Sequence, residues 1–441
     1  MTGKTGHKAD RDRYENNTSR EALSFRAMII CPKSVVDNWC RELRTWGYFK
    51  VIKFEAFKHY GRHDRERVGD HTEVVVGGIE EVREHIAKGL SFDPVLVFVD
   101  EAHRLKSASS ATVQKFHEFK TPYKFALTGT AIQNHLEELH TIIDWTCPGQ
   151  VGNREQWKTF VSDPIKRAQN IKASDREFAV GRMRSIALAG LCLPVFMIRR
   201  TKEIIKDQLP TKTDYIVLCP MTQTQYDVYL RFVRSKDVKD IRDHDEPCEC
   251  GAEDDEGLPY ARGNCCGDDW GKKTFKYLAV FLKISNHIAL IYPDEMDKAS
   301  DPERFENHER FTEIAFPGDG ASRRLTGTTF LQQELCGKWE ILKGLLKAFK
   351  EEGAKVLLFS GSRKLLGLVK DLLKTVPAFN FVSLDGTTPA NLRQGLVDKF
   401  NSKEEEVFIF LSTTKAGGVG LNLTAANKVR SRSRKRRVTD R

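Results

Sequence analysis

Two adjacent carboxylates follow a strongly apolar run in the first quarter of the chain. Asp100-Glu101-Ala102-His103 comes directly after Val95–Val99, and a continuous apolar run of this kind is typical of a strand buried on both faces. Parallel sheets bind ligands beyond the carboxyl ends of their strands. An aspartate there can hold Mg²⁺ on nucleotide phosphates, and the adjacent glutamate can deprotonate an attacking water. A bare Asp-Glu pair is more often a solvated turn, but the apolar strand and the following Ala-His favour a catalytic pair.

A second polar segment follows the next apolar run. Residues 124–127 lead into Thr128-Gly129-Thr130, and Gln133 comes shortly after. Hydroxyl groups and a flexible glycine at the end of a neighbouring strand can bond the carboxylate pair and sense the terminal phosphate of a nucleotide. Alone, this segment would be equally typical of a helix N-cap. Its distance in sequence from the carboxylates favours nucleotide-sensing roles for Thr128, Gly129, Thr130 and Gln133.

The elements that must position these residues are visible as short β-rich runs ending in Gly, Ser, Thr or Asp. They span 27–32, 73–78, 94–103, 124–130, 355–362, 381–387 and 406–414. Helical patterns such as 34–46 and 364–376 lie between many of them. This alternation predicts an α/β fold with mostly parallel sheets. The strands form two clusters, separated by a mostly helical middle at 131–354.

Charge and composition limit the class of protein. The 441 residues carry a formal charge of +10 and ten cysteines. The last 14 residues hold eight Lys or Arg and one Asp, so the other 427 are nearly neutral. No apolar run approaches the ~18 residues that a membrane span needs, which rules out an integral membrane protein, and the polar N-terminus rules out a secretory signal. The cysteines are too sparse for a disulfide framework, which favours reduced thiols or a metal site.

Four further segments, in order along the chain, complete a set of six motifs. They are Cys31-Pro32-Lys33-Ser34 with Asn38-Trp39, Phe196–Lys202 with Leu209-Pro210, Leu384–Thr387 with Arg393, and Ser412–Leu423. The ordered set resembles the SWI/SNF-type DNA-dependent ATPases, which are helicase-like motors of superfamily two. The resemblance covers residues from about 27 to 429. Thr414–Leu423 and the Cys-bearing insertion are most similar to the Cockayne-syndrome-B-like, excision-repair branch.

The resemblance implies two RecA-like lobes that use ATP and Mg²⁺. Asp100 and Glu101 would hold Mg²⁺ and the hydrolytic water, and His103 would act with them as an acid or base or would be a packed histidine. Thr128 and Thr130 would couple the phosphate state to the grip on DNA. Three glycines would let backbone N–H groups approach phosphates closely; alternatively they form a strand-to-helix turn. These glycines are Gly417, Gly418 and Gly420.

The resemblance also implies a partner, double-stranded DNA, contacted through its backbone without reading sequence. The residues expected to contact DNA are Lys33, Ser34, Ser360, Arg393 and Thr413. Chromatin proteins or repair and transcription proteins would be further partners, and the location would be nuclear. No membrane partner is expected.

The patterns divide the chain into five parts. Residues 1–26 are a polar stretch, 27–235 the ATP-binding lobe one, and 236–276 an acidic, Cys-rich insertion; 277–429 are lobe two and 430–441 a basic tail. Within the insertion, 240–256 hold nine acidic residues and one Arg. A segment so polar is expected at the surface rather than in a core.

Two motifs of the family are not found in this sequence. Gly3-Lys4-Thr5 lacks the first glycine and the preceding strand of G-x-x-x-x-G-K-[ST], so we do not interpret it as a phosphate-binding loop. Without that strand, lobe one is expected to have an open gap. Beyond Val429 the family carries arginines that act on the γ-phosphate. Here residues 430–437 are a basic run, typical of a nuclear-targeting or polyanion-binding tail or of a gene-model artefact.

The function implied is an ATP-dependent DNA translocase of chromatin remodelling or DNA repair, with negligible ATP hydrolysis by this chain alone because both motifs are missing. Two other interpretations stay open. The chain would then be a catalytically dead scaffold that binds DNA or protein, or a truncation product without a stable fold.

Four cysteines in the insertion have a spacing compatible with a zinc site. Cys248, Cys250, Cys265 and Cys266 lie within 19 residues, and four thiolates bind Zn²⁺ tetrahedrally. Adjacent ligands are less common than C-x-x-C, so four reduced thiols in a loop are an equal alternative. His244 or His287 would be substitute ligands.

Overall fold

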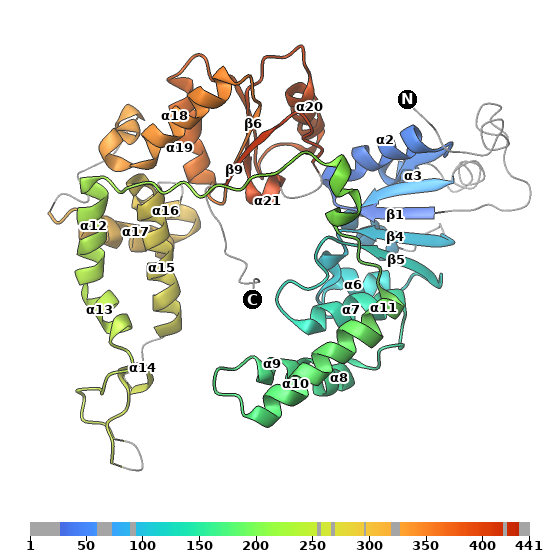
Figure 1. The fold of residues 1–441 in the computed structure, drawn as a ribbon, viewed down its shortest axis with the longest axis horizontal. Coiled ribbons are helices and arrows are strands. Elements are labelled where there is room, and N and C mark those ends of the chain that lie inside the picture. Colours follow the sequence, from blue (N-terminus) through green and yellow to red (C-terminus); the bar gives the residue numbers. More distant parts are fainter. Residues whose placement is uncertain are drawn as a thin grey trace, which may run out of the picture. The chain divides into compact units, whose positions relative to one another are not determined.

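The computed structural model describes residues 27–59, 73–88, 94–253, 257–265, 270–294, 297–318, 327–417 and 421–431. The polar stretch 1–26, Cys266, Gly418, Gly420 and most of the basic tail (432–441) lie outside the described residues. The chain forms two compact units (Figure 1). Of the described residues, unit 1 holds those up to Lys212 together with Leu421, and unit 2 holds the others from Thr213.

Unit 1 is built on a five-stranded parallel sheet in the order β2-β3-β1-β4-β5. The strands are β1 (Ala27–Cys31), β2 (Val51–Lys53), β3 (Val74–Gly78), β4 (Leu96–Asp100) and β5 (Tyr123–Leu127). Four of them were predicted from their apolar runs. β2 was not, because three partly exposed residues carry too little pattern. Neighbouring strands are hydrogen-bonded throughout, and the gap expected in lobe one stays a prediction.

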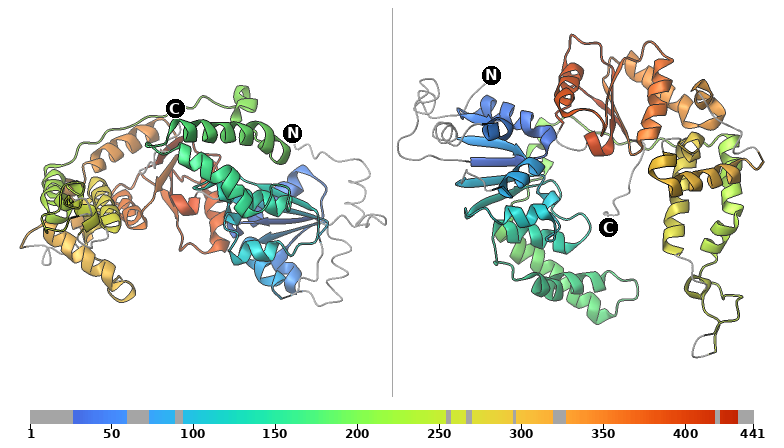
Figure 2. Two further views of the ribbon diagram at one scale, coloured as in Figure 1. Left: turned by 90° about the horizontal axis from the view of Figure 1, so that it is seen from below. Right: turned by 180° about the vertical axis from the view of Figure 1, so that it is seen from behind.

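Helices cover both faces of the sheet around β1 and β3 (Figure 2). On one face α2 (Val36–Trp46) packs on the strands through Cys40 and the partly buried Trp39 and Leu43. The other face carries α5 (Ile79–Ile86), α6 (Ala111–Phe116) and α7 (Leu136–Thr146), with short α3 (Phe54–His59) beside β3. This two-sided burial explains why the strand sequences are continuously apolar.

The edge strand β5 is less covered than the others. Among the described residues it ends the sheet. Tyr123, Phe125 and Leu127 are 56%, 44% and 39% exposed, and Phe125 stacks on Phe98 of β4 with ring centroids 4.9 Å apart. The exposed apolar surface therefore lies on one face of the sheet, at its β5 edge.

A helical extension completes unit 1. It contains α8 (Arg154–Trp157), α9 (Asp163–Ala168), α10 (Asp175–Ala187) and α11 (Leu193–Phe196). A side chain at Gly181 of α10 would collide with Ala168 and the Pro164 carbonyl of α9, so these two helices pack closely. Among the described residues, Asp175–Phe196 is the one helical stretch long and apolar enough to cross a membrane, which the sequence analysis did not anticipate. One such helix, judged by length and composition, is weak evidence of a span.

Unit 2 holds a second parallel sheet in the order β7-β8-β6-β9. The strands are β6 (Val356–Ser360), β7 (Phe381–Leu384), β8 (Ile409–Thr413) and β9 (Lys428–Ser431). Flanking helices are α18 (Lys338–Glu351), α19 (Arg363–Lys374), α20 (Ala390–Asn401) and short α21 (Thr414–Gly417). Strand β9 was not predicted. It includes Arg430 and Ser431, so the sheet extends into the first residues of the predicted basic tail.

The rest of unit 2 is helical, as predicted for the middle of the chain. Its main helices are α12 (Gln223–Arg234), α13 (Lys236–Arg242), α15 (Trp270–Asn286) and α17 (Pro302–Ala315), with short α14 (Arg262–Cys265) and α16 (Asp297–Ser300). Helices α12, α15 and α17 share an apolar core that includes Val228, Phe232, Ile284 and Phe311. They enclose Gln225, which is 1% exposed and donates to the Ile284 carbonyl at 2.7 Å.

The observed division differs in two places from the predicted parts. Helix α12 lies before residue 235, the predicted end of lobe one, but belongs to unit 2. Within the predicted insertion 236–276, Val238 and Ile241 of α13 pack against the helical core. The polar loop is therefore confined to the segment between α13 and α15. The α/β fold with two parallel sheets and a helical middle is confirmed.

Candidate active site at the carboxyl edge of the unit 1 sheet

The predicted catalytic pair lies where β4 ends. Asp100 is the last residue of β4, aligned with Leu127 of β5, and a 3-10 turn, Ala102–Leu105, follows. Between them Glu101 has φ 51° and ψ 45°, and it is the one non-glycine residue with positive φ among the described residues. This left-handed conformation costs about 1–2 kcal/mol for an L-residue with a Cβ. Such strain is typical of functional sites, because surrounding contacts must hold it in place.

Both oxygens of the Asp100 carboxylate accept hydrogen bonds. The indole Nε1 of Trp39, on α2, donates to Oδ2 at 2.9 Å, and the backbone N–H of Glu101 donates to Oδ1 at 2.8 Å. These two donors fix the plane of the carboxylate, and each oxygen keeps a further lone pair for a cation. Trp39 belongs to the first of the four further motifs named in the sequence analysis. Its hydrogen bond to Asp100 spans 61 residues of sequence, so no local sequence pattern predicts it.

Glu101, His103 and Thr128 form a connected group. His103 Nδ1 lies 3.1 Å from Glu101 Oε2 and 3.2 Å from Thr128 Oγ1. Because a carboxylate only accepts hydrogen bonds, Nδ1 carries a proton when it bonds Glu101. The side chains of Glu101 and His103 are 27% and 26% exposed. The geometry thus orients Glu101 through a histidine N–H while leaving it open to a small molecule.

The Thr128–Thr130 segment forms a tight turn after β5. Thr128 Oγ1 accepts from Thr130 N at 3.1 Å and donates to Thr130 O at 3.3 Å. A Cβ added at Gly129 would meet no atom within 4 Å, so local packing does not require glycine there. Gln133 is held by Lys106, whose Nζ donates to its Oε1 at 2.9 Å. The structure therefore brings the nucleotide-sensing candidates of unit 1 to the same strand ends as the carboxylates.

Glu138 anchors this loop and was missed by the sequence analysis. It is 7% exposed, and its Oε2 accepts from the backbone N–H groups of Gln133 at 2.7 Å and Asn134 at 3.1 Å. Burial raises the pKa of Glu138, but these two N–H bonds, the Lys106 charge and the Asn134 side chain outweigh it and hold the pKa below its ordinary value. In the sequence Glu138 looks like an ordinary acidic residue in the first turn of α7.

Glu138→Gln should lower the free energy of unfolding by about 1–2 kcal/mol, because a hydrogen bond to a charged acceptor is stronger than one to an amide. The pKa of Glu138 is depressed in the fold, so its contribution is present at neutral pH and is lost as the pH falls below about 4.3, the ordinary glutamate value. Urea unfolding at pH 7 and at acid pH measures both effects. Glu137→Gln, in the same helix turn, is the matched control. Equal losses of unfolding free energy at pH 7 and at acid pH would contradict the lowered pKa of Glu138.

The DNA-contact candidates of unit 1 lie at the same edge of the sheet. Lys33 and Ser34 stand in the 3-10 turn Lys33–Val35, which follows β1 directly. Lys33 is exposed and Ser34 is partly exposed. Their contacts with DNA stay predictions.

Two of the candidates of unit 2, Ser360 and Thr413, end β6 and β8, and the third, Arg393, lies on α20 after β7. Ser360 is 1% exposed and its Oγ donates to Ser362 O at 3.2 Å, so it serves a turn. Thr413 Oγ1 accepts from Ala416 N at 3.2 Å, and Arg393 Nε donates to Thr388 O at 3.0 Å. Their contacts with DNA also stay predictions.

Gly417 has a packing reason to be glycine. A Cβ there would lie 2.6 Å from Ser412 Oγ and 2.7 Å from the Phe359 ring. It ends α21 directly after β8, which fits the strand-to-helix turn named as the alternative. Its nucleotide-sensing role stays a prediction, and Gly418 and Gly420 lie outside the described residues.

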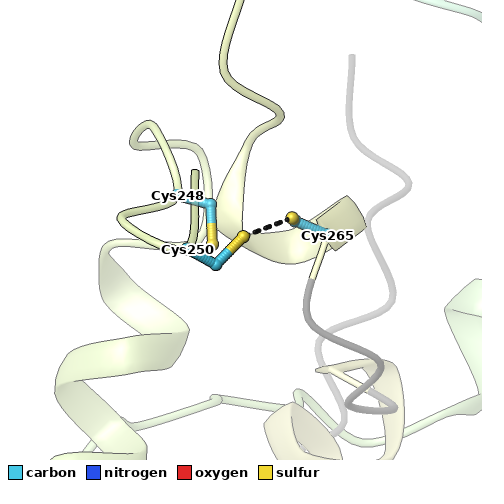
Figure 3. A group of neighbouring side chains, drawn as sticks. All are labelled: Cys248, Cys250 and Cys265. Carbon is cyan, nitrogen blue, oxygen red and sulfur yellow. Dashed lines mark hydrogen bonds between the residues drawn. The ribbon is translucent and has the colours of Figure 1, made fainter. Parts of the chain in front are cut away.

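The cysteines of the insertion come together in unit 2 (Figure 3). The sulfur atoms of Cys248, Cys250 and Cys265 all lie within 4.8 Å of one another. His287 is not with them, because its Nε2 bonds Phe330 O at 3.0 Å and its Nδ1 accepts from Ala289 N. His287 is therefore excluded as the substitute ligand.

Two family models match the chain. The SNF2-related domain matches residues 5–252, and the helicase conserved C-terminal domain matches residues 337–431. A solved structure, the Sulfolobus solfataricus SWI2/SNF2 ATPase core in complex with double-stranded DNA, aligns with a TM-score of 0.37 and 20% identity, covering 96% of this chain and 73% of that one.

Curated proteins are also similar over most of the chain. Switch 2 of Arabidopsis thaliana is 32% identical over 432 residues, covering 91% of this chain and 48% of Switch 2. The DNA excision repair protein ERCC-6-like 2 of Mus musculus is 33% identical, covering 91% of this chain and 26% of its own length. The DNA repair and recombination protein RAD54B of Gallus gallus is 29% identical, with 91% and 41% covered. The chain thus spans about a quarter to about half of these relatives.

Proposed function

Because the chain belongs to the SNF2-related family, we propose that it is the motor region of an ATP-dependent DNA translocase that serves DNA repair or chromatin remodelling. Its two units are the RecA-like lobes of the superfamily-two fold. The observation that carries the proposal is the connected group of Asp100, Glu101, His103 and Thr128 at the strand ends of unit 1.

ATP and Mg²⁺ are the proposed ligands of this edge. Carboxylate oxygens are the donors that Mg²⁺ prefers, and Asp100 presents both of its oxygens in a fixed plane. When bound, Mg²⁺ would neutralise charge on the phosphates. Glu101 then accepts the proton of the attacking water, with His103 holding its carboxylate in place. Thr128 links this pair to the loop that carries Gly129, Thr130 and Gln133.

The proposed polymer is double-stranded DNA, held through its phosphates. Lys33 and Ser34 in unit 1 and Ser360, Arg393 and Thr413 in unit 2 are the proposed contacts. Phosphate contacts carry no sequence information, so binding should be insensitive to sequence and should weaken steeply with salt. The names of the repair relatives support a nuclear location and partners among repair, transcription or chromatin proteins.

The test is DNA-stimulated phosphate release by the full-length protein, together with its affinity for duplexes of unrelated sequence at several salt concentrations. We expect stimulation by duplex DNA and similar affinities for all sequences. Binding without any ATP hydrolysis would favour the second candidate, a scaffold that binds DNA or protein. If the protein neither binds DNA nor hydrolyses ATP, both candidate functions are overturned.

The chain printed here, purified alone, should show negligible DNA-stimulated hydrolysis. Its sequence contains no G-x-x-x-x-G-K-[ST] segment, and that loop cradles the phosphates of the nucleotide. Phosphate release by this chain should be measured with and without duplex DNA. Stimulated release from the isolated chain, abolished by Glu101→Gln, would show the hypothesis to be wrong.

Trp39→Phe should raise the Mg²⁺ concentration needed for nucleotide binding by roughly ten- to a hundredfold. Phenylalanine keeps the apolar contacts of α2 but removes the donor to Asp100 Oδ2, and a hydrogen bond to a charged group contributes about 1.5–3 kcal/mol. Binding of a fluorescent ATP analogue to the full-length protein, titrated with Mg²⁺, measures the change. Trp46→Phe is the matched control, since Trp46 lies on the same helix, is 60% exposed and bonds Glu42. Identical Mg²⁺ curves for both variants would contradict a positioning role of Trp39.

A further inference from the structure

We propose that Cys248, Cys250 and Cys265 bind a Zn²⁺ ion that holds together the loop between α13 and α15. Three thiol groups converge in this loop, with every sulfur within 4.8 Å of the others. Thiolates around tetrahedral Zn²⁺, at about 2.3 Å from the metal, lie about 3.8 Å apart. The three sulfurs therefore lie close enough together for one ion to bind all of them.

A disulfide does not account for the cluster. The Sγ atoms of Cys250 and Cys265 are 3.1 Å apart, whereas a disulfide bond is about 2.05 Å long. A disulfide also joins two sulfurs, and here a third from Cys248 completes the group (Figure 3). Three sulfurs around one point are typical of a metal site.

The backbone of the loop brings the ligands together. Cys248 N donates to Tyr260 O at 2.8 Å, and Arg262 N donates to Glu246 O at 2.9 Å. The two sides of the loop also form isolated antiparallel bridges between Pro247 and Ala261 and between residues 253 and 259. This pairing places the C-x-C segment opposite α14, which ends at Cys265.

No apolar core supports this loop. None of its described side chains between residues 244 and 263 is buried. Small segments that cannot bury enough apolar surface commonly depend on a metal or a disulfide for their order. A Zn²⁺ ion would provide the missing cross-link and would join the ends of α13 and α15, which both pack in the helical core of unit 2.

One cation lies against the ligand segment, although residues 240–256 hold nine acidic residues and one Arg. The Arg262 guanidinium donates to Glu249 Oε1 at 2.5 Å and to Pro247 O at 3.4 Å. It is thus fixed to the ligand segment and can offset the negative charge that three thiolates leave on Zn²⁺.

The test is elemental analysis of the full chain produced with zinc present, and it involves neither ATP nor DNA. We expect one zinc per chain. Cys250→Ser and Cys265→Ser should lose it, while the control Cys219→Ser, outside the loop, should keep it. Zinc near zero in the unmodified chain, or equal zinc in all variants, would overturn the proposal.

A second measurement keeps the proposal testable if the serine variants do not fold. Exchange of the metal in the unmodified chain for Co²⁺ should give the intense near-ultraviolet absorption of cobalt–thiolate bonds, and a chelator should abolish it. Co²⁺ binding without this absorption would show that the thiols are not ligands. Iron in place of zinc would equally overturn the choice of metal.

Discussion

Glu101→Gln in the full-length protein should lower DNA-stimulated ATP hydrolysis by about 10²- to 10⁴-fold, the contribution typical of a positioned general base. Glutamine has nearly the same shape and keeps an oxygen 3.1 Å from His103 Nδ1, the distance at which Glu101 Oε2 lies. It cannot take a proton from water. Binding of nucleotide and DNA should therefore be nearly unchanged while turnover is lost.

Phosphate release and duplex-DNA affinity, measured on the same preparation, separate these two effects. Glu80→Gln is the matched control, because Glu80 pairs with Arg104 of the adjacent turn at 3.3 Å and has no contact with the carboxylate pair among its described interactions. The control should retain activity. An active Glu101→Gln variant would remove Glu101 from the proposed mechanism.

Gly337→Ala should destabilise unit 2 by about 3 kcal/mol, at the upper end of what overpacking usually costs. Gly337 precedes α18, and its N–H donates to Gln225 Oε1 at 2.8 Å. An added Cβ would collide with the Pro220 carbonyl oxygen and would lie 3.4 Å from Thr222 N. These are backbone atoms, so they cannot rotate away as a side chain would. The substitution must therefore separate α18 from the start of α12.

Chemical denaturation followed by circular dichroism measures the loss. Gly344→Ala is a control of opposite sign, because it lies within α18 and an added Cβ meets no atom within 4 Å. It should stabilise by about 0.5–1 kcal/mol, since alanine is the better helix former. Equal effects of the two substitutions would show that close packing at Gly337 is not the cause.

The strands that the sequence predicted share a continuous apolar run, and in the centre of the unit 1 sheet that run reflects burial on both faces. β1 and β3 are buried at every residue, so each position is apolar and the run is unmistakable. β2 and β9 were missed because their own residues show no continuous apolar run. Both are strands because they pair with a neighbouring strand. β9 begins with Lys428 and contains Arg430, yet it pairs in register with β6.

The candidate site was predictable in its residues but not in its connections. Asp100, Glu101 and Thr128 stand out because they end apolar runs. The bonds from Trp39 to Asp100 and from Glu138 to the Gln133 loop depend on how α2 and α7 pack, which no local pattern encodes. The unit boundary shows the same limit, since α12 joins unit 2 through its packing on α15 and α17.

The exposed strand β5 has a consequence for handling the protein in the laboratory. Among the described residues β5 ends its sheet and shows three large apolar side chains, and such a strand is a template for pairing with another chain. Concentrated solutions of the printed chain should therefore aggregate through this edge before either unit unfolds. Replacing Phe125, whose ring is 44% exposed, with a charged residue should improve the solubility of the chain. The gain should be larger than that from the same replacement in a buried strand.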